Sequence, residues 1–261
     1  MGDVLEAGSD IRQFAFETDA GVAGRATIGL IVLATDQTIE YEFRKIIALP
    51  GVALYQSRIK SPIEITPDSL RAMESEIAGG TDVILPSIPL DVVGFGCTSA
   101  SMLLGEETVG KRIREARPDV PFTTPITGAF AGLRALGAKR IAVLTPYTDA
   151  VNVGVRDYVQ NQGGFEVTAM GSFKEIDDRV AARISPASIA KAAEALVASA
   201  DVDALFISCT SLRIIDDIAE LEARIGVPAT SSNHALAWHS LRLAGVHDKL
   251  PQFGKLFTVS P

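Results

Sequence analysis

The sequence is poor in the residues from which disulfides and metal sites are built. Its 261 residues include 2 Cys, 3 His and 1 Trp. Two cysteines cannot form the dense disulfide framework of a small secreted domain, and in a reducing compartment they stay free thiols. The histidines are not accompanied by further ligands at metal-site spacing. Whatever chemistry the chain performs must therefore use ordinary side chains, and two thiols are the most distinctive of these.

Excess positive charge and long apolar runs are also missing. The net charge is −8, and no cluster of Lys and Arg with interleaved aromatics occurs, which argues against a nucleic-acid partner. No apolar run reaches the roughly 18 residues of a membrane span. The first 26 residues are polar and acidic, unlike a signal peptide. We expect a cytoplasmic protein that acts on a small molecule and has no membrane partner.

What the chain does contain is a regular alternation of short apolar runs and helical patterns. Such alternation is typical of an α/β protein with parallel sheets covered by helices on both faces. The pattern predicts strands at 27–33, 52–58, 91–96, 121–124, 140–145, 165–170, 204–208 and 227–230. It predicts helices at 39–48, 66–78, 105–116, 127–136, 151–162, 185–199, 216–224 and 234–243, with 177–178 in a loop.

The second part of the chain repeats the first. Short βα units always resemble one another, but shared motifs in the same order are a stronger sign of duplication. Three such motifs recur about 110 residues later in the chain: Thr35-Asp36 as Thr148-Asp149, Cys97-Thr98-Ser99 as Cys209-Thr210-Ser211, and Val120-Pro121 as Val227-Pro228. The fold is therefore predicted as two pseudo-symmetric, flavodoxin-like parallel-sheet halves with the active site between them.

This interpretation divides the chain into four parts. Residues 1–26 form an N-terminal arm, 27–137 the first α/β half, 138–246 the second half and 247–261 a C-terminal tail. The terminal helices of the halves could exchange between them.

Both cysteines follow a predicted strand, where ligands bind in parallel sheets. If the halves face each other, Cys97 and Cys209 approach a substrate from opposite sides. One thiolate could then remove a proton from a carbon next to a carboxylate, and the other thiol could return one, without a metal or organic cofactor. A following helix would favour the thiolate. The alternative is a pair of inert core cysteines.

Other side chains near these turns could bind the substrate. The hydroxyls that follow the cysteines and the backbone N–H groups of the turns could hold a carboxylate and stabilise an enediolate; the hydroxyls are those of Thr98, Ser99, Thr210 and Ser211. Asp36 and Asp149 each follow the first strand of a half, where they could bind an ammonium group or simply cap a helix. Tyr147 could donate to a carboxylate or merely pack. The pair Asp177-Asp178 could bind a cation or form a solvated face.

These motifs resemble the aspartate/glutamate racemase superfamily, in the branch with maleate isomerase and arylmalonate decarboxylase. The resemblance runs from about residue 27 to 246 and is carried by five segments: Gly29-Leu30-Ile31-Val32, Gly96-Cys97-Thr98-Ser99-Ala100-Ser101, Gly132-Leu133-Arg134-Ala135-Leu136-Gly137, Thr145-Pro146-Tyr147 and Ser208-Cys209. The sequence of residues 31–38 is most similar to that of the ectoine-utilisation subgroup often labelled EutA. The resemblance implies a homo-oligomer, either a dimer or a tetramer.

Departures from these relatives narrow the expected reaction. The decarboxylases have glycine where Cys97 stands, so two cysteines favour racemase or isomerase chemistry. Maleate isomerases have asparagines where Asp36 and Asp178 stand, and an ionised Asp can only accept hydrogen bonds. Aspartate in place of asparagine at these two positions disfavours a dicarboxylate substrate. It suits an amino-acid derivative, such as a derivative of diaminobutyrate. The alternatives are a cis–trans isomerase or a decarboxylase with one essential cysteine, and a metabolite-binding module without turnover.

Overall fold

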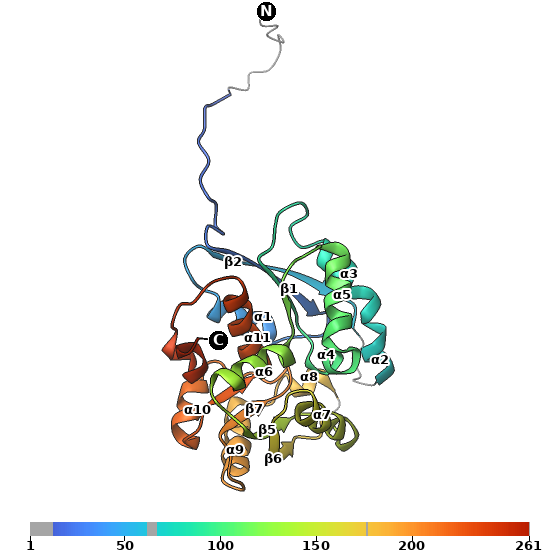
Figure 1. Ribbon diagram of the computed structural model, residues 1–261, viewed down its shortest axis with the longest axis vertical. Helices are drawn as coiled ribbons and strands as arrows, with labels where there is room; N and C mark the ends of the chain where they lie inside the picture. Colours follow the sequence, from blue (N-terminus) through green and yellow to red (C-terminus); the bar gives the residue numbers. More distant parts are fainter. Residues whose placement is uncertain (1–12, 62–66, 176, 261) are drawn as a thin grey trace, which may run out of the picture.

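Two four-stranded parallel sheets form the centre of the molecule, in the orders β2-β1-β3-β4 and β6-β5-β7-β8 (Figure 1). The computed structural model describes residues 13–61, 67–175 and 177–260. The predicted α/β fold with two equivalent sheets is confirmed. The strands are β1 Ala26–Leu33, β2 Val52–Ile59, β3 Val92–Phe95, β4 Phe122–Thr123, β5 Arg140–Thr145, β6 Glu166–Ser172, β7 Ala204–Ile207 and β8 Ala229–Ser231.

The apolar runs become strands because helices cover both faces of each sheet. Every residue of β1 is buried, as are all four residues of β3 and of β7. The duplication extends to single hydrogen bonds. After β3 the Gly96 N–H donates to the Ile31 carbonyl, and after β7 the Ser208 N–H donates to the Leu144 carbonyl, both at 2.8 Å. The two cysteines therefore leave their sheets at equivalent places.

Most of the predicted helices are present, with three differences. The helix expected at 66–78 is two helices that meet at Met73. A further short helix precedes the one expected at 105–116, and Gly105 separates the two with a φ of 82°, which favours glycine. The expected loop at 177–178 begins a short helix instead, because Asp177 caps it. In the first half the helices are α1 Ile39–Ile46, α2 Pro67–Ala72, α3 Glu74–Asp82, α4 Thr98–Leu104, α5 Glu106–Ala116 and α6 Pro125–Ala135.

The second half carries α7 Asp149–Asn161, α8 Asp178–Ala181, α9 Pro186–Val197, α10 Ile218–Ile225 and α11 Ser232–Leu243. The chain ends with two 3₁₀ turns, η1 Pro251–Phe253 and η2 Lys255–Thr258, and Leu256 and Phe257 of η2 are buried. In the described ranges, no helix is long and apolar enough to cross a membrane.

Helices α6 and α11 pack against each other at the junction of the halves (Figure 1). Helix α11 also contacts α1, β3 and β4 of the first half, whereas α6 contacts β8 of the second half. The crossing is close because Gly128 of α6 faces the backbone of Ala235 in α11. This packing holds the two sheets together next to the ends of β3 and β7.

Replacement of Gly128 by alanine is expected to destabilise the protein by about 1–3 kcal/mol, because overpacking of a tight contact shifts the backbone. An added Cβ would lie 2.6 Å from the Ala235 carbonyl oxygen. Gly79 in α3 is a matched control, since a Cβ there meets no described atom within 4 Å. Gly79→Ala should stabilise by about 0.5–1 kcal/mol through helix propensity. Urea unfolding of both variants measures the difference, and equal effects would contradict the close crossing.

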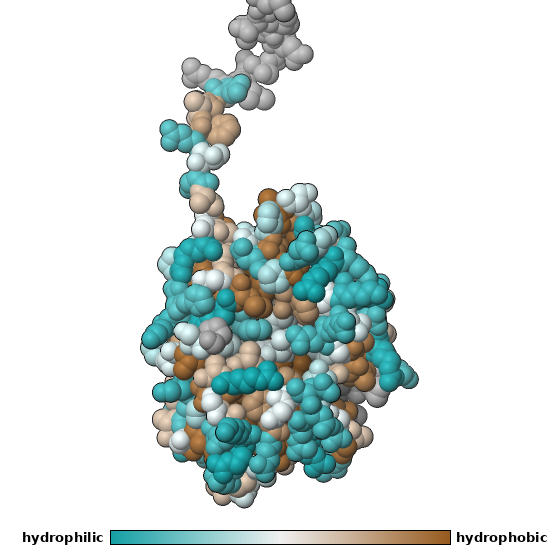
Figure 2. All heavy atoms as spheres, viewed as in Figure 1, coloured by the Kyte–Doolittle hydropathy of each residue, from teal (hydrophilic) through white to brown (hydrophobic). Residues whose placement is uncertain are grey.

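The described part of the N-terminal arm, residues 13–24, leaves the body as an extended segment (Figures 1 and 2). Its Phe14 and Phe16 are 74% and 83% exposed. Arg25 at its base pairs with Asp248 near the other end of the chain. Residue Ala26, the last of the predicted arm, already belongs to β1, and residues 1–12 lie outside the described part of the chain.

Candidate active site

One cavity between the halves contains both cysteines. Its free volume, including the open mouth, is about 420 Å³. Polar groups come from both halves, and aliphatic side chains close the remaining wall. The lining residues are Cys97, Thr98, Ser99, Tyr147, Asp178, Cys209, Thr210, Thr35, Leu33, Leu70 and Met73. The structure therefore brings together seven predicted site residues, including Asp178, from four separate segments of the chain.

Cys97 is the N-cap of α4. Its Sγ accepts a hydrogen bond from the Ala100 N–H at 3.4 Å and lies 3.8 Å from the Ser99 hydroxyl. The expected helix after this thiol is therefore present. Burial nevertheless raises the pKa of Cys97 to about 11. Desolvation of the thiol by the surrounding protein outweighs the effect of the helix N-terminus, and Cys97 is protonated near neutral pH.

Cys209 is followed by a turn rather than directly by a helix, since α10 begins only at Ile218. Its Sγ accepts the Ser211 N–H at 3.4 Å. The neighbouring Tyr147 hydroxyl acts to lower the pKa of this thiol. Burial, and then the negative charge of Asp178, raise the pKa of Cys209 to about 12. The expectation of a helix N-terminus at both thiols is thus met only at Cys97.

Asp178, in the first turn of α8, is 8% exposed and lines the cavity. It accepts a hydrogen bond from the hydroxyl of Ser211. Burial raises the pKa of its carboxyl. Ser211 itself does not line the cavity. It supports the site from behind, through Asp178 and through its N–H to Cys209.

Asp36 also lies behind the cavity wall. Its Oδ1 accepts the N–H groups of Thr38 and Ile39, both at 2.8 Å, and so it caps the start of α1. Its Oδ2 is buried and has no hydrogen-bond partner among the described residues. Burial raises the pKa of Asp36 to about 6. The capping role is present, while the charge of Asp36 raises the pKa of Cys97.

Asp149 does not face the cavity, contrary to expectation. Helix α7 begins at Asp149 itself, whereas α1 begins three residues after Asp36. The carboxylate is therefore on the surface, with its side chain 77% exposed and paired with Lys174 at 2.9 Å. The duplicated Thr-Asp motif has different roles in the two halves.

Asp36→Asn should stabilise the protein at alkaline pH. Asn keeps the oxygen that caps α1 and removes a buried charge. Because the pKa of Asp36 is raised from 3.8 to about 6, the folded state binds this proton more tightly than the unfolded chain. Its contribution to stability is complete below pH 3.8 and lost as the pH rises through about 6.

A pKa difference of about 2 corresponds to about 3 kcal/mol, which is the largest advantage expected for Asp36→Asn at about pH 8. The advantage should shrink as the pH falls toward about 4. Denaturant unfolding at both pH values measures it, with the exposed Asp149→Asn as control. An advantage that does not change with pH would contradict the buried charge.

The first turn of α11 connects the two cysteine turns. The Thr98 hydroxyl, next to Cys97, donates to the Ser232 hydroxyl at 2.8 Å. The Asn233 side-chain amide donates to the carbonyl of Thr210, next to Cys209, at 2.7 Å. Both α11 residues are completely buried. The separation of the two thiols is thus held by side chains of a single helix turn.

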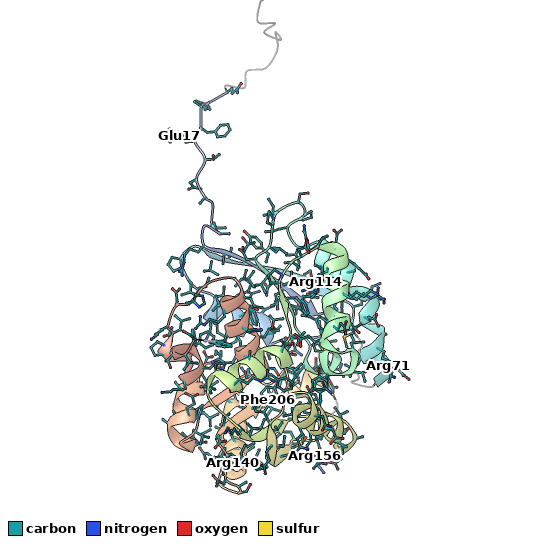
Figure 3. All side chains as sticks on the ribbon, viewed as in Figure 1. Glu17, Arg71, Arg114, Arg140, Arg156 and Phe206 are labelled. Atoms are coloured by element: carbon teal, nitrogen blue, oxygen red, sulfur yellow. The ribbon has the colours of Figure 1, made fainter. Side chains whose placement is uncertain are left out.

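The site carries negative charge without a compensating cation. No lining residue within the described ranges is Lys, Arg or His. Figure 3 shows Arg71 and Arg156 near the edge of the molecule, whereas Phe206 of β7 is completely buried. In the part of the chain described, no group of three or more His, Cys, Asp or Glu side chains is placed to hold a metal ion.

Several residues of the site were not predicted. Thr35 lies next to Asp36 and could have been found from the strand end. Leu33, Leu70 and Met73 look like core residues, and only tertiary packing places them on the cavity wall. Glu42, which lies outside the cavity and accepts the Asn233 side-chain amide, had a detectable signal, because it is a charged residue on the core-facing stripe of α1 with Ile39 and Phe43. Asn233 gave no such signal.

The two facing sheets and the shared cavity define a two-lobed α/β protein with a thiol site between its halves. The sequence profile described as arylmalonate decarboxylase matches residues 82–257. The chain therefore belongs to the arylmalonate decarboxylase family. This confirms the predicted branch and the expectation of an enzyme of the isomerase and decarboxylase type.

Arylmalonate decarboxylases and maleate isomerases are both similar to this chain. The arylmalonate decarboxylase of Bordetella bronchiseptica is 36% identical over 150 residues, 57% of this chain and 62% of that protein. The match thus spans under two thirds of that relative. The maleate isomerase of Pseudomonas putida is 28% identical over 248 residues, 88% of this chain and 96% of that protein.

Solved structures show the same fold. Unliganded arylmalonate decarboxylase superposes with a TM-score of 0.75 and 28% identity, covering 89% of this chain and 99% of that one. A maleate cis–trans isomerase from Nocardia farcinica superposes with a TM-score of 0.81 and 24% identity, covering 89% and 98%. That isomerase carries a covalently bound succinylcysteine intermediate, so a cysteine reacts in that protein.

Proposed function

We propose that this protein is a cofactor-independent racemase or isomerase that acts at the α-carbon of a small carboxylate, an amino-acid derivative. The supporting observation is the presence of Cys97 and Cys209 in one cavity, each from the equivalent turn of its own half. A single buried thiol is common in protein cores, whereas two thiols at equivalent strand ends would suit a reaction that approaches one carbon from two sides.

In the proposed reaction, one thiolate removes the α-proton and the C–H electron pair moves into the carboxylate to form an enediolate. The opposite thiol then donates its proton to the other face of the carbon, so that the proton count is unchanged. Hydroxyls of Ser99 and Thr210, and the N–H groups of the turns, stabilise the enediolate. The neighbouring Tyr147 hydroxyl, which acts to lower the pKa of Cys209, stabilises this thiol when it is charged.

The charge of the site supports a substrate with an ammonium group. Asp178 on the cavity wall and Asp36 behind it would repel a second carboxylate, and no cation within the described lining would offset this. An ammonium group beside Asp178 would compensate its charge, which is one of the causes of the raised pKa of Cys209. Such a substrate would therefore favour the thiolate of Cys209, which burial and the charge of Asp178 disfavour.

A derivative of diaminobutyrate has the required carboxylate and ammonium groups. We place the chain in the ectoine-utilisation subgroup because the sequence of residues 31–38, which includes Asp36, resembles that subgroup. We also propose a cytoplasmic homo-oligomer. These assignments rest on resemblance. Turnover of a diaminobutyrate derivative tests the assignment of the substrate.

A second candidate function is decarboxylation or cis–trans isomerisation with one essential cysteine. It is favoured by the 36% identity to a decarboxylase and by the coverage of 96% of a maleate isomerase. The two candidates differ in products. A racemase incorporates solvent deuterium at the α-carbon and inverts the configuration of that carbon. A decarboxylase releases CO₂, and a cis–trans isomerase changes the geometry of a double bond.

The test is incubation of the purified protein in heavy water with a panel of compounds. The panel contains 2,4-diaminobutyrate, its N-acetyl derivatives, phenylmalonate and maleate. Mass spectrometry and chiral chromatography follow deuterium uptake and inversion. Exchange in the amino-acid derivatives supports the proposal. Turnover of phenylmalonate or maleate alone selects the second candidate, and binding without any exchange selects a metabolite-binding module.

A further inference from the structure

Glu42 is a completely buried carboxyl group that the proposed reaction does not use. It projects from α1 of the first half toward the second half. Its Oε1 accepts the N–H groups of Ile214 and Ile215, at 2.7 and 2.8 Å, in the segment that follows the Cys209 turn. Its Oε2 accepts the side-chain amide of Asn233 at 2.8 Å. Burial of a carboxylate costs free energy, so a completely buried Glu is a candidate for a specific role.

Asn233 links Glu42 directly to the Cys209 turn. Its amide nitrogen has two hydrogens, one donated to Glu42 and the other to the Thr210 carbonyl at 2.7 Å. The Thr38 hydroxyl of the first half donates to the same carbonyl. The peptide that follows Cys209 is thus held by α1 and α11, outside its own sheet.

The chemistry at position 42 requires a carboxylate. Three N–H donors converge on two oxygens, and an ionised carboxylate is an acceptor only. Glutamine could accept the two backbone N–H groups through its oxygen, but its own NH₂ would then face the Asn233 amide donor. If Asn233 turned its amide, its oxygen would face the Thr210 carbonyl. An amide at position 42 therefore breaks the bridge to Thr210 in either arrangement.

We infer that Glu42 is a positioning residue that, through Asn233, fixes the Cys209 turn relative to the Cys97 turn. The same first turn of α11 holds the Cys97 side, through Ser232 and Thr98. Glu42 therefore acts on one thiol only, since its contacts lead to Thr210 and to the segment after it. The inference rests on the proposed two-thiol site for its functional meaning, but its test requires no substrate.

The test measures the alkylation rate of each cysteine separately. Wild type, Glu42→Gln, Glu42→Ala and the control Glu40→Gln react with iodoacetamide at about pH 8.5, near the ordinary thiol pKa. Peptide mass spectrometry follows Cys97 and Cys209. Glu40 is on the same helix, and its pairs with Arg44 and Arg58 are on the surface, so the control makes the same substitution outside the bridge.

Loosening the turn should expose Cys209, whose buried thiol is 4% exposed in wild type. We expect Cys209 to react about tenfold faster in Glu42→Gln, and faster still in Glu42→Ala, which also frees two backbone donors. Cys97 should keep its rate within about twofold, and Glu40→Gln should match wild type. Circular dichroism melting identifies variants that do not fold.

Equal acceleration of both cysteines would show general loosening and overturn the inference, as would an unchanged Cys209. If Glu42→Ala does not fold, the isosteric Glu42→Gln decides alone. Failure of the proposed function appears elsewhere, in the heavy-water exchange of wild type. The selective rate at Cys209 is independent of that result.

Discussion

Replacement of either Cys97 or Cys209 by serine is expected to reduce solvent-deuterium exchange and racemisation at least about a hundredfold, the effect typical of losing a general acid or base. A serine hydroxyl is a far weaker acid than a thiol and cannot replace it in proton transfer near neutral pH. Both variants should fold, because the change is nearly isosteric in a cavity that already contains hydroxyls. Exchange rates by mass spectrometry, with the substrate found in the screen, measure the loss.

The two variants together decide between the candidate functions. Loss in both requires two thiols and supports the racemase. Full activity in both variants refutes the two-thiol mechanism. If one of the two variants is active and the other is inactive, the enzyme has one essential thiol. Asp149→Asn is a suitable control, since Asp149 occupies the duplicated position but lies on the surface.

Replacement of Asp178 by asparagine is expected to weaken binding of 2,4-diaminobutyrate about 10- to 100-fold, the value of one charge-assisted hydrogen bond. The asparagine would keep the oxygen that accepts the Ser211 hydroxyl but would lose the negative charge. The double variant Asp36→Asn/Asp178→Asn should bind maleate more tightly than wild type, because it removes both carboxylates and adds an amide donor on the cavity wall. Calorimetric titration with the two compounds measures both changes.

Asp177→Asn is the matched control for this series. Asp177 caps α8 and pairs with Arg179, and asparagine can also cap a helix. This variant should bind both compounds as wild type does. Undiminished binding of 2,4-diaminobutyrate by Asp178→Asn would contradict the assignment of Asp178 to the ammonium group.

Much of the fold could be predicted because burial leaves a clear local pattern. Strands covered on both faces are mostly apolar, and every residue of β1, β3 and β7 is buried. The duplication then placed the two cysteines at equivalent positions, which no single strand could have indicated. The breaks at Met73 and between α4 and α5 were missed, because they depend on backbone turns inside helix-like sequence.

The site was less predictable where equivalent motifs diverge. Asp36 and Asp149 occupy the same place in the repeat, yet the earlier start of α7 exposes Asp149 and leaves Asp36 buried. Glu42 and Asn233 are far apart in the sequence and in different halves. Their hydrogen bond exists only because α11 packs on the first half, next to α1.

The sequence by itself determined the class of fold, the duplication and the identity of the two thiols, because hydrophobic pattern and repeated motifs are local properties of the chain. Only the tertiary structure decided that Cys97 and Cys209 share a cavity and that their pKa values are raised. It also decided that a buried carboxylate supports the Cys209 turn. These properties arise from desolvation and from contacts between segments distant in the chain, which no local pattern contains.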